Sequence, residues 1–202
     1  MIHPVTLISR WTVGSPQRQQ AAADAELARL RRIGLPDGCH DLTIYTSLNG
    51  ESILLRAELA GVHAFHAFPV GPRGAADRDE VDQTVPGIVR HGVTGYRSHR
   101  RIHNAMGQAV CTSIVETHFY EPDEALYWAV EVANTGRWSG SLATMFYVSL
   151  DHSQALSVTD WSDVNAAPTK PPSDAPRSRS DGNQHNRCEV YRAHGTLTTA
   201  RR

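Results

Sequence analysis

Histidine is the residue type in this chain whose side chain titrates nearest neutral pH, and several histidines gather in the first half. They are His63, His66, His91, His99 and His103. Among them, His66 is a candidate general base. His63 and His66 are three residues apart, but no HExxH motif accompanies them. The sequence therefore predicts no metal site, and the alternative for these histidines is the polar face of a sheet.

Two similar strings form the second candidate group. They are Tyr96-Arg97-Ser98-His99 and Tyr191-Arg192-Ala193-His194. A guanidinium can hold a phenolate oxygen with its planar fork, so Arg97 is a candidate catalytic residue and Arg192 a candidate substrate-binding residue. Tyr96 and Tyr191 are candidate walls of a pocket. The alternatives are arginines at the surface of an edge strand and tyrosines that only pack in the core.

Trp161 is the third candidate and the least symmetric one. It ends the run Leu156-Ser157-Val158-Thr159-Asp160-Trp161, whereas the matching place in the first half holds Leu59. An aromatic side chain at the end of a strand is either part of the core or the wall of a reactive pocket. If it is the latter, the two halves are not equivalent, and the sequence leaves open which half is catalytic.

Composition narrows the class of protein. The 202 residues are 40% hydrophobic and 20% charged, as in ordinary globular chains. The formal net charge of -1 gives no reason to expect nucleic acid or an anionic membrane as a partner. The N-terminus lacks the pattern of a secretory signal, and the three cysteines lack a CxxC motif. A reducing cytoplasm is therefore the expected location.

The elements that must position these residues follow the same order in both halves. Alternating and β-branched runs predict strands, and alanine-rich runs after Pro16 and Pro122 predict helices. Asn49-Gly50 predicts a hairpin turn between strands 41–48 and 52–59. The first half also has a short helical segment over 62–68 and a last strand over 85–101.

This order, β-α-β-β-(α)-β, is the ferredoxin-like arrangement. We predict an α+β fold of two ferredoxin-like repeats, residues 1–104 and 108–202, whose antiparallel sheets pack as an α/β barrel. Each sheet would otherwise leave one face bare, so the pair forms an intramolecular pseudo-dimer. Residues 166–186, which contain almost no large apolar side chain, are predicted to be a flexible loop.

The repeated motifs carry a family likeness. Within a half, a hairpin such as Ser47-Leu48-Asn49-Gly50 comes first, then a string such as Asp160-Trp161-Ser162, which is clearest in the second half. The ending from Pro86-Gly87 to Tyr96-Arg97-Ser98-His99 comes last and is clearer in the first half. In this the chain resembles the antibiotic biosynthesis monooxygenase family of dimeric α/β barrels, over nearly its whole length.

The resemblance implies an activity. Such proteins include oxygenases that convert anthrone-like polyketides to quinones with molecular oxygen, often without metal or flavin. We therefore expect a monooxygenase that needs no cofactor and acts on a polycyclic aromatic polyketide. Its expected partners are the aromatic substrate and oxygen, with a homo-oligomer left open. Trp161, His66 and Arg97 are its expected catalytic residues, and Tyr96, Tyr191 and Arg192 its expected contacts with substrate.

Two alternatives stay open at this point. One is an oxygenase of the same likeness that cleaves a ring with reduced flavin, although no GxGxxG motif is present. The other is a non-catalytic protein that binds a polyketide or assists its cyclisation. The polar segment in the second half favours this second alternative. Likeness of fold alone does not determine function.

Overall fold

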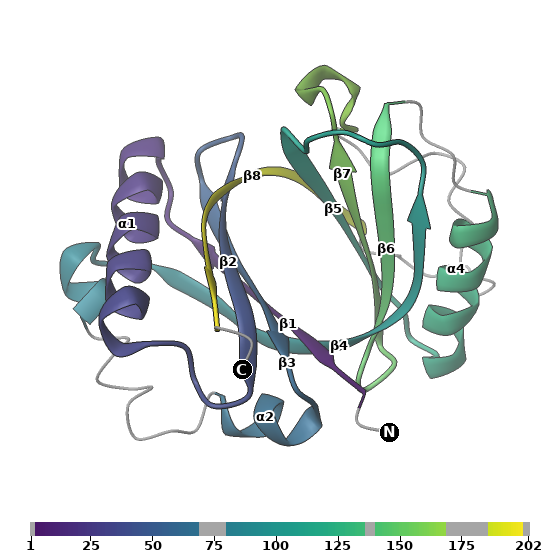
Figure 1. Cartoon of the computed structure of the whole chain (residues 1–202), viewed down its shortest axis with the longest axis horizontal. Coiled ribbons are helices and arrows are strands. Elements are labelled where there is room, and N and C mark those ends of the chain that lie inside the picture. Colours follow the sequence, from purple (N-terminus) through teal and green to yellow (C-terminus); the bar gives the residue numbers. More distant parts are fainter. Residues whose placement is uncertain (1–2, 69–79, 136–139, 169–185, 200–202) are drawn as a thin grey trace. The chain divides into compact units, whose positions relative to one another are not determined.

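The computed structural model describes residues 3–68, 80–135, 140–168 and 186–199 (Figure 1). Most of the predicted loop over 166–186 lies outside this range. The elements of the first part are β1 (Val5–Thr12), α1 (Pro16–Ile33), β2 (Cys39–Ser47), β3 (Ser52–Leu59), α2 (Val62–Ala67) and β4 (Val89–His103). Those of the second part are β5 (Cys111–His118), α4 (Pro122–Thr135), β6 (Ser141–Ser149), β7 (Gln154–Trp161), the 3-10 helix η1 (Val164–Ala166) and β8 (Asn186–Thr198).

The fold class follows from the pairing of the strands. Hydrogen bonds join them in the order β1-β3-β2-β8-β5-β7-β6-β4, which is the closed order of a barrel. The pairs β1–β3, β2–β3, β5–β7 and β6–β7 are all antiparallel. This confirms the prediction of an α+β barrel fold, and the order strand, helix, strand, strand recurs in both parts.

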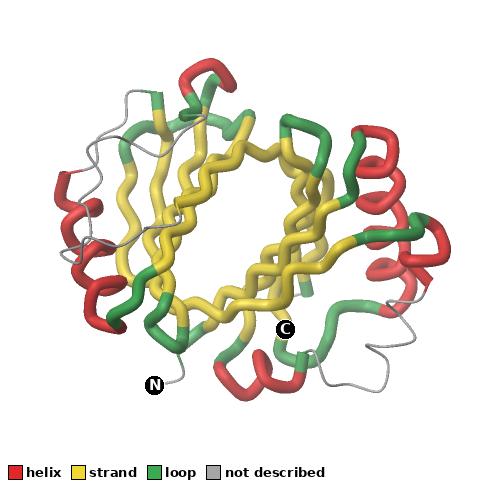
Figure 2. The backbone as a smooth tube through the Cα atoms, turned by 180° about the vertical axis from the view of Figure 1, so that it is seen from behind, coloured by secondary structure: helices red, strands yellow, loops and turns green. Residues whose placement is uncertain are grey.

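The chain divides into two compact units, and β4 and β8 each contribute to both. Unit 1 comprises Met1–Gly95 and Ala193–Arg202, and unit 2 comprises Tyr96–Arg192. The predicted division into repeats at residues 104 and 108 stays a prediction. In each unit the long helix lies against one face of that unit's own strands (Figures 1 and 2).

Helix α1 of unit 1 begins and ends as its sequence predicts. Ser15 caps it by accepting a hydrogen bond from the Arg18 backbone N–H, Pro16 opens it, and Gly34 ends it at a positive φ of 81°. Its buried face includes Leu27 and Leu30. This apolar stripe is what holds the helix against the strands.

The prediction that the last strand of the first half spans residues 85–101 was wrong about where that strand begins and ends. β4 begins only at Val89, because residues 80–84 are helical and Pro86-Gly87 form the turn that follows. Gly87 has a φ of 80°, a conformation that favours glycine. The strand then continues to His103, beyond the predicted end.

The two hairpins, β2–β3 and β6–β7, share one hydrogen-bonding pattern. The Ser47 hydroxyl donates to Asn49 and accepts from the Ser52 backbone N–H. Likewise, the Ser149 hydroxyl donates to Asp151 and accepts from the Gln154 N–H. This shared pattern fixes which residues of the two units correspond in position.

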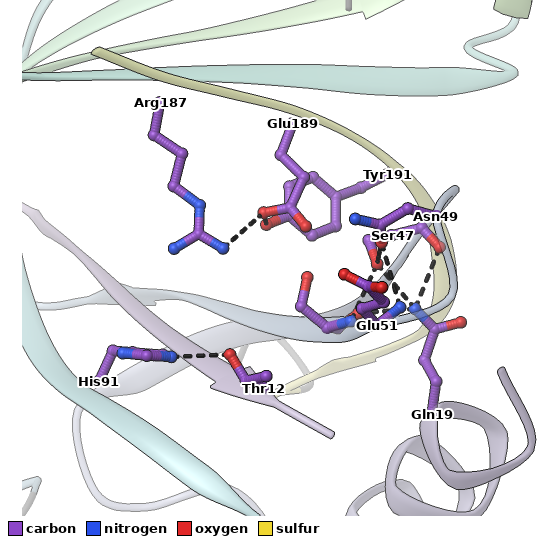
Figure 3. Close-up of polar contacts among 10 residues, drawn as sticks. Thr12, Gln19, Ser47, Asn49, Glu51, His91, Arg187, Glu189 and Tyr191 are labelled. Carbon is purple, nitrogen blue, oxygen red and sulfur yellow. Dashed lines mark hydrogen bonds and ion pairs between the residues drawn. The ribbon is translucent and has the colours of Figure 1, made fainter. Parts of the chain in front are cut away.

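In unit 1 a side chain of the helix is hydrogen-bonded to the hairpin. The Gln19 side-chain amide of α1 donates to the Ser47 carbonyl at 3.0 Å, the Ser47 hydroxyl at 2.9 Å and the Ser52 carbonyl at 2.7 Å (Figure 3). The corresponding place in unit 2, the fourth residue of α4, is the buried Ala125. The hairpin of unit 1 is therefore held by a buried polar contact that unit 2 does not have at this position.

Candidate functional site

Trp161 lies at the end of β7 and is almost fully buried. Its indole N–H donates to the Ser113 hydroxyl of β5 over 2.8 Å. Its ring packs in an apolar cluster with Cys111, Ala167 and Val190. A buried indole normally has a partner for its N–H, and here the partner comes from the neighbouring strand of the same sheet. The ring is thus fixed in one orientation.

Trp161 belongs to the face of the sheet that is turned toward α4. Alternate residues of a strand share a face, so Ala155, Ser157, Thr159 and Trp161 lie in one row along β7. Ala155 packs with Trp128 and Ala129 of α4 in a second apolar cluster. The row therefore runs from a cluster beneath α4 to the cluster around Trp161, and hydroxyl side chains stand between the two.

This layer of unit 2 is unusually rich in buried hydroxyls. They belong to Ser113, Thr117, Thr144, Ser157 and Thr159, all on the face turned toward α4. The Thr159 hydroxyl donates to Thr144 at 3.1 Å. In contrast, within the described part of the chain, Ser157 Oγ and Thr117 Oγ1 have no hydrogen-bond partner although each residue is only 1% exposed.

A buried hydroxyl without a partner is costly. The loss of its hydrogen bonds to water costs about 1–3 kcal/mol when nothing replaces them. Ser157 lies opposite Val115, and Thr117 lies opposite Ala155, so the two hydroxyls are diagonal neighbours on adjacent strands. Two such groups side by side suit a ligand that supplies the missing partners.

The matching face of unit 1 can be recognised from contacts of β8. A Cβ at Gly195 would come within 2.6 Å of Leu27 in α1, so position 195 is turned toward that helix. Its neighbour Thr196 hydrogen-bonds Thr43, which places Thr43 on the face turned away from α1. Leu42 and Ile44, on either side of Thr43, therefore face the helix.

In unit 1 the positions that correspond to this layer hold apolar side chains. By the register of the strands, Leu59 corresponds to Trp161, Leu55 to Ser157, Ala57 to Thr159, Leu7 to Ser113 and Trp11 to Thr117. All five side chains of unit 1 are buried. The hydroxyl-lined layer is therefore a property of unit 2, and unit 1 has an ordinary hydrophobic core in its place.

Two predicted site residues lie on the other face of the unit 2 sheet. Tyr191 pairs with Thr112, the neighbour of Cys111, and Tyr96 pairs with Ser149, the neighbour of Val148. Both tyrosines are fully buried. Because successive residues of a strand point to opposite faces, neither tyrosine shares the layer of Trp161.

The buried tyrosine hydroxyls are engaged with polar side chains on that face. Tyr96 donates to Gln154 at 2.7 Å, and Glu116 lies 3.3 Å away. Tyr191 donates to Glu189 at 2.6 Å, and Glu189 also forms an ion pair with Arg187 at 3.2 Å (Figure 3). These contacts account for both hydroxyls and make the tyrosines part of a polar network.

The two predicted arginines differ in their surroundings. Arg97 and Arg192 are both exposed. Arg192 is close enough to Cys111 to act on its thiol: burial raises the pKa of Cys111, and the arginine charge partly opposes that rise. Since Cys111 pairs with Trp161, the structure brings Arg192 to the Trp161 end of the layer. Arg97 pairs with Val148, farther along the same face.

His66 belongs to unit 1. It lies on α2 and is exposed, with its ring edge-on to Phe65 at 5.4 Å between centroids. Within the described part of the chain, no three His, Cys, Asp or Glu side chains form a group that could hold a metal ion. Of the predicted residues, then, Trp161, Arg192 and Arg97 belong to the α4 face of the unit 2 sheet, and only Arg192 lies at its Trp161 end.

The residues that sequence reasoning missed are the hydroxyls themselves. Serine and threonine are common in strands, so Ser157 and Thr117 carry no motif. A signal does exist in the comparison of the halves, because aligned positions hold Leu55 and Trp11 in unit 1. A change from large apolar to small polar at buried, aligned positions marks this layer.

Comparison with known proteins supports the fold. No protein-family model and no curated protein sequence matches the chain. The fold is ferredoxin-like. An anthrone oxidase-like protein has a similar solved structure, with a TM-score of 0.72, 13% identity, and coverage of 97% of this chain and 93% of that one.

Two further solved structures share the ferredoxin-like fold over nearly full length. A candidate monooxygenase from Fusobacterium nucleatum has a TM-score of 0.60 and 12% identity, covering 98% of this chain and 95% of its own. A ferredoxin-fold protein of Listeria monocytogenes, related to antibiotic biosynthesis monooxygenases, has a TM-score of 0.51 and 11% identity, with coverage of 96% and 95%. At these identities the likeness shows the fold alone.

Proposed function

We propose that this ferredoxin-like protein is a monooxygenase that oxidises a polycyclic aromatic polyketide of the anthrone or hydroquinone type to a quinone. The observation that carries the proposal is the fixed indole of Trp161 at the end of a layer of buried hydroxyls in unit 2. A flat aromatic substrate suits an indole wall, and its oxygens suit hydroxyl partners. The fold shared with an anthrone oxidase-like protein supports the same reading.

The reaction can be written without a bound cofactor. Loss of a proton from the phenol or enol of an anthrone gives an electron-rich anion, which can pass an electron to molecular oxygen. Recombination then forms a carbon–oxygen bond. Loss of water completes the change, so that CH2 and O2 become C=O and H2O. One oxygen atom enters the product, the other leaves as water, and the substrate itself supplies the electrons.

The chain's part in this scheme is to bind, orient and stabilise. Arg192, near the Trp161 end of the layer, would favour the anionic form of the substrate by its charge. The apolar cluster of Trp161, Ala167 and Val190 would keep water away from the reactive carbon.

Within the described residues, no helix is both long and apolar enough to cross a membrane. The proposal places the reaction in the cytoplasm, in keeping with three free cysteines.

A second candidate function is binding without turnover. The row from Ala155 to Trp161 offers, among its described side chains, only neutral groups, which favours binding over proton transfer. In the flavin-dependent alternative, the protein would consume oxygen only when reduced flavin is added. These three outcomes can be separated in one assay.

The test is oxygen uptake with dithranol, a dihydroxyanthrone, corrected for autoxidation. We expect the wild type to accelerate uptake without added flavin and Trp161→Leu, which copies the residue of unit 1, to reduce the rate at least tenfold. Leu59→Met, at the matching place in unit 1, is the control and should keep the wild-type rate. Uptake at the autoxidation rate, with substrate still bound, would leave the protein a binding protein.

A further inference from the structure

Ser157 and Thr117 carry an inference that goes beyond the reaction. Their hydroxyls are buried in unit 2 and lack a hydrogen-bond partner among the described residues. They lie on adjacent strands as diagonal neighbours, a relationship that places the two residues about 7–8 Å apart and their Cβ atoms somewhat closer. One ligand group cannot easily serve both, but a flat molecule with two oxygen functions can.

We propose that these two hydroxyls are the specificity-determining contacts for the oxygens of a neutral, flat aromatic ligand, and that each chain holds a single such site, in unit 2. This inference rests on the binding site given under the proposed function, but it does not require the protein to catalyse the oxidation. A hydroxyl can donate to a carbonyl and accept from a phenol, so it suits both oxygen types of a hydroxylated anthrone or quinone.

Unit 1 shows why the site is single. The positions that match Ser157 and Thr117 hold Leu55 and Trp11, which are 5% and 6% exposed. The Trp11 indole N–H has its own acceptor in the Ser9 hydroxyl at 3.1 Å. Large, buried side chains thus stand where unit 2 has the two hydroxyls. Neither Leu55 nor Trp11 presents a buried polar group that lacks a partner among the described residues.

The alternative is that the two hydroxyls contribute only to the stability of the fold. The two cases differ in what removal of the hydroxyl does to the free protein. If the hydroxyl serves a ligand, removing it relieves an unpaired buried group, so that stability does not fall while affinity does. If the hydroxyl serves the fold, stability falls and affinity does not.

The experiment compares Thr117→Val with Thr112→Val, two equal substitutions on β5. Thr112 lies on the opposite face, and its hydroxyl donates to Asp160 at 2.8 Å. Binding is followed by quenching of tryptophan fluorescence with chrysazin, the dihydroxyanthraquinone that corresponds to dithranol, and stability by thermal unfolding. Ser157→Ala is measured in the same way.

We expect Thr117→Val and Ser157→Ala each to weaken chrysazin binding by about fivefold without lowering the Tm. Thr112→Val should lower the Tm by roughly 2–4 °C and leave the affinity unchanged. The wild type should bind one chrysazin per chain. Equal affinity in all variants, two sites per chain or no quenching of the wild type would overturn the inference. Binding as expected without oxygen uptake would overturn only the proposed function.

Discussion

The Trp161 indole and the Ser113 hydroxyl form a hydrogen bond of 2.8 Å across two strands, in a unit whose counterpart has Leu59 and Leu7 at these places. The contact orients the ring that we place beside the substrate. In unit 1 two buried leucines stand at these places.

Removal of this acceptor gives the first prediction. Ser113→Ala should lower the free energy of unfolding by about 1 kcal/mol, because the buried indole N–H loses this partner. In a double-mutant cycle with Trp161→Phe, the two changes should couple by about 0.5–1.5 kcal/mol. Chemical denaturation measures both quantities. Strict additivity would show that the hydrogen bond contributes nothing to stability.

Gln19 gives a prediction about unit 1 alone. Its amide makes three hydrogen bonds to the β2–β3 hairpin and is buried, so Gln19→Leu should cost about 1–3 kcal/mol of unfolding free energy. The exposed Gln20→Leu, on the next position of α1, is the control and should change stability by less than about 0.5 kcal/mol. Equal effects of the two substitutions would argue against the buried contact.

Asp151 gives a prediction of pH dependence. Hydrogen bonds from Ser149 and Ser153 hold the pKa of the Asp151 carboxyl below its usual value. A depressed pKa means that the charged form stabilises the folded state above the unfolded pKa, and that this contribution is lost as pH falls through the folded pKa.

The substitution Asp151→Asn removes the titration and keeps an oxygen acceptor, as Asn49 does in the first hairpin. The variant should therefore have a lower free energy of unfolding than the wild type near neutral pH. This gap between the two proteins should shrink as the solution is acidified below about pH 4. Unfolding curves between acid and neutral pH measure this. A difference that does not depend on pH would mean that the charge of Asp151 is irrelevant to the hairpin.

The cysteines give a prediction of reactivity. Burial, with smaller contributions from neighbouring carboxylates, raises the pKa of Cys39 to about 12 and that of Cys188 to about 11. Both thiols should stay protonated at pH 8 and react slowly with iodoacetamide in the folded protein, whereas all three cysteines should react in denaturant. In the unfolded chain these thiols ionise at a lower pH than in the folded protein. The free energy of unfolding should therefore decline as the pH rises beyond about 9. Rapid labelling of folded Cys39, read by mass spectrometry, would contradict this.

Much of the fold could be predicted from local signals. Pro16 after Ser15, the Asn49-Gly50 turn and the alternating strands each have a local physical cause, and each lies where the sequence indicated. The start of β4 could not be predicted in this way. Residues 80–84 adopt a helix, and Val85 follows it directly. A β-branched residue before a proline, as Val85 is before Pro86, is nevertheless typical of a strand.

The site was predicted only in part. The difference between Trp161 and Leu59 is visible in the sequence, but the sequence could not say which side chains share a layer with Trp161. That depends on register: Tyr96 and Arg97 are neighbours in sequence and so must point to opposite faces. Ser157 and Thr117 are distant in sequence, and only the pairing of β5 with β7 brings their hydroxyls together.

The most direct test of the account is a crystal structure of the protein with chrysazin bound. The account predicts one ligand per chain, stacked beside Trp161 in unit 2, with its oxygens within hydrogen-bonding distance of Ser157 and Thr117. A ligand on the Tyr96 and Tyr191 face, or one among Leu55, Leu59 and Trp11 of unit 1, would contradict it.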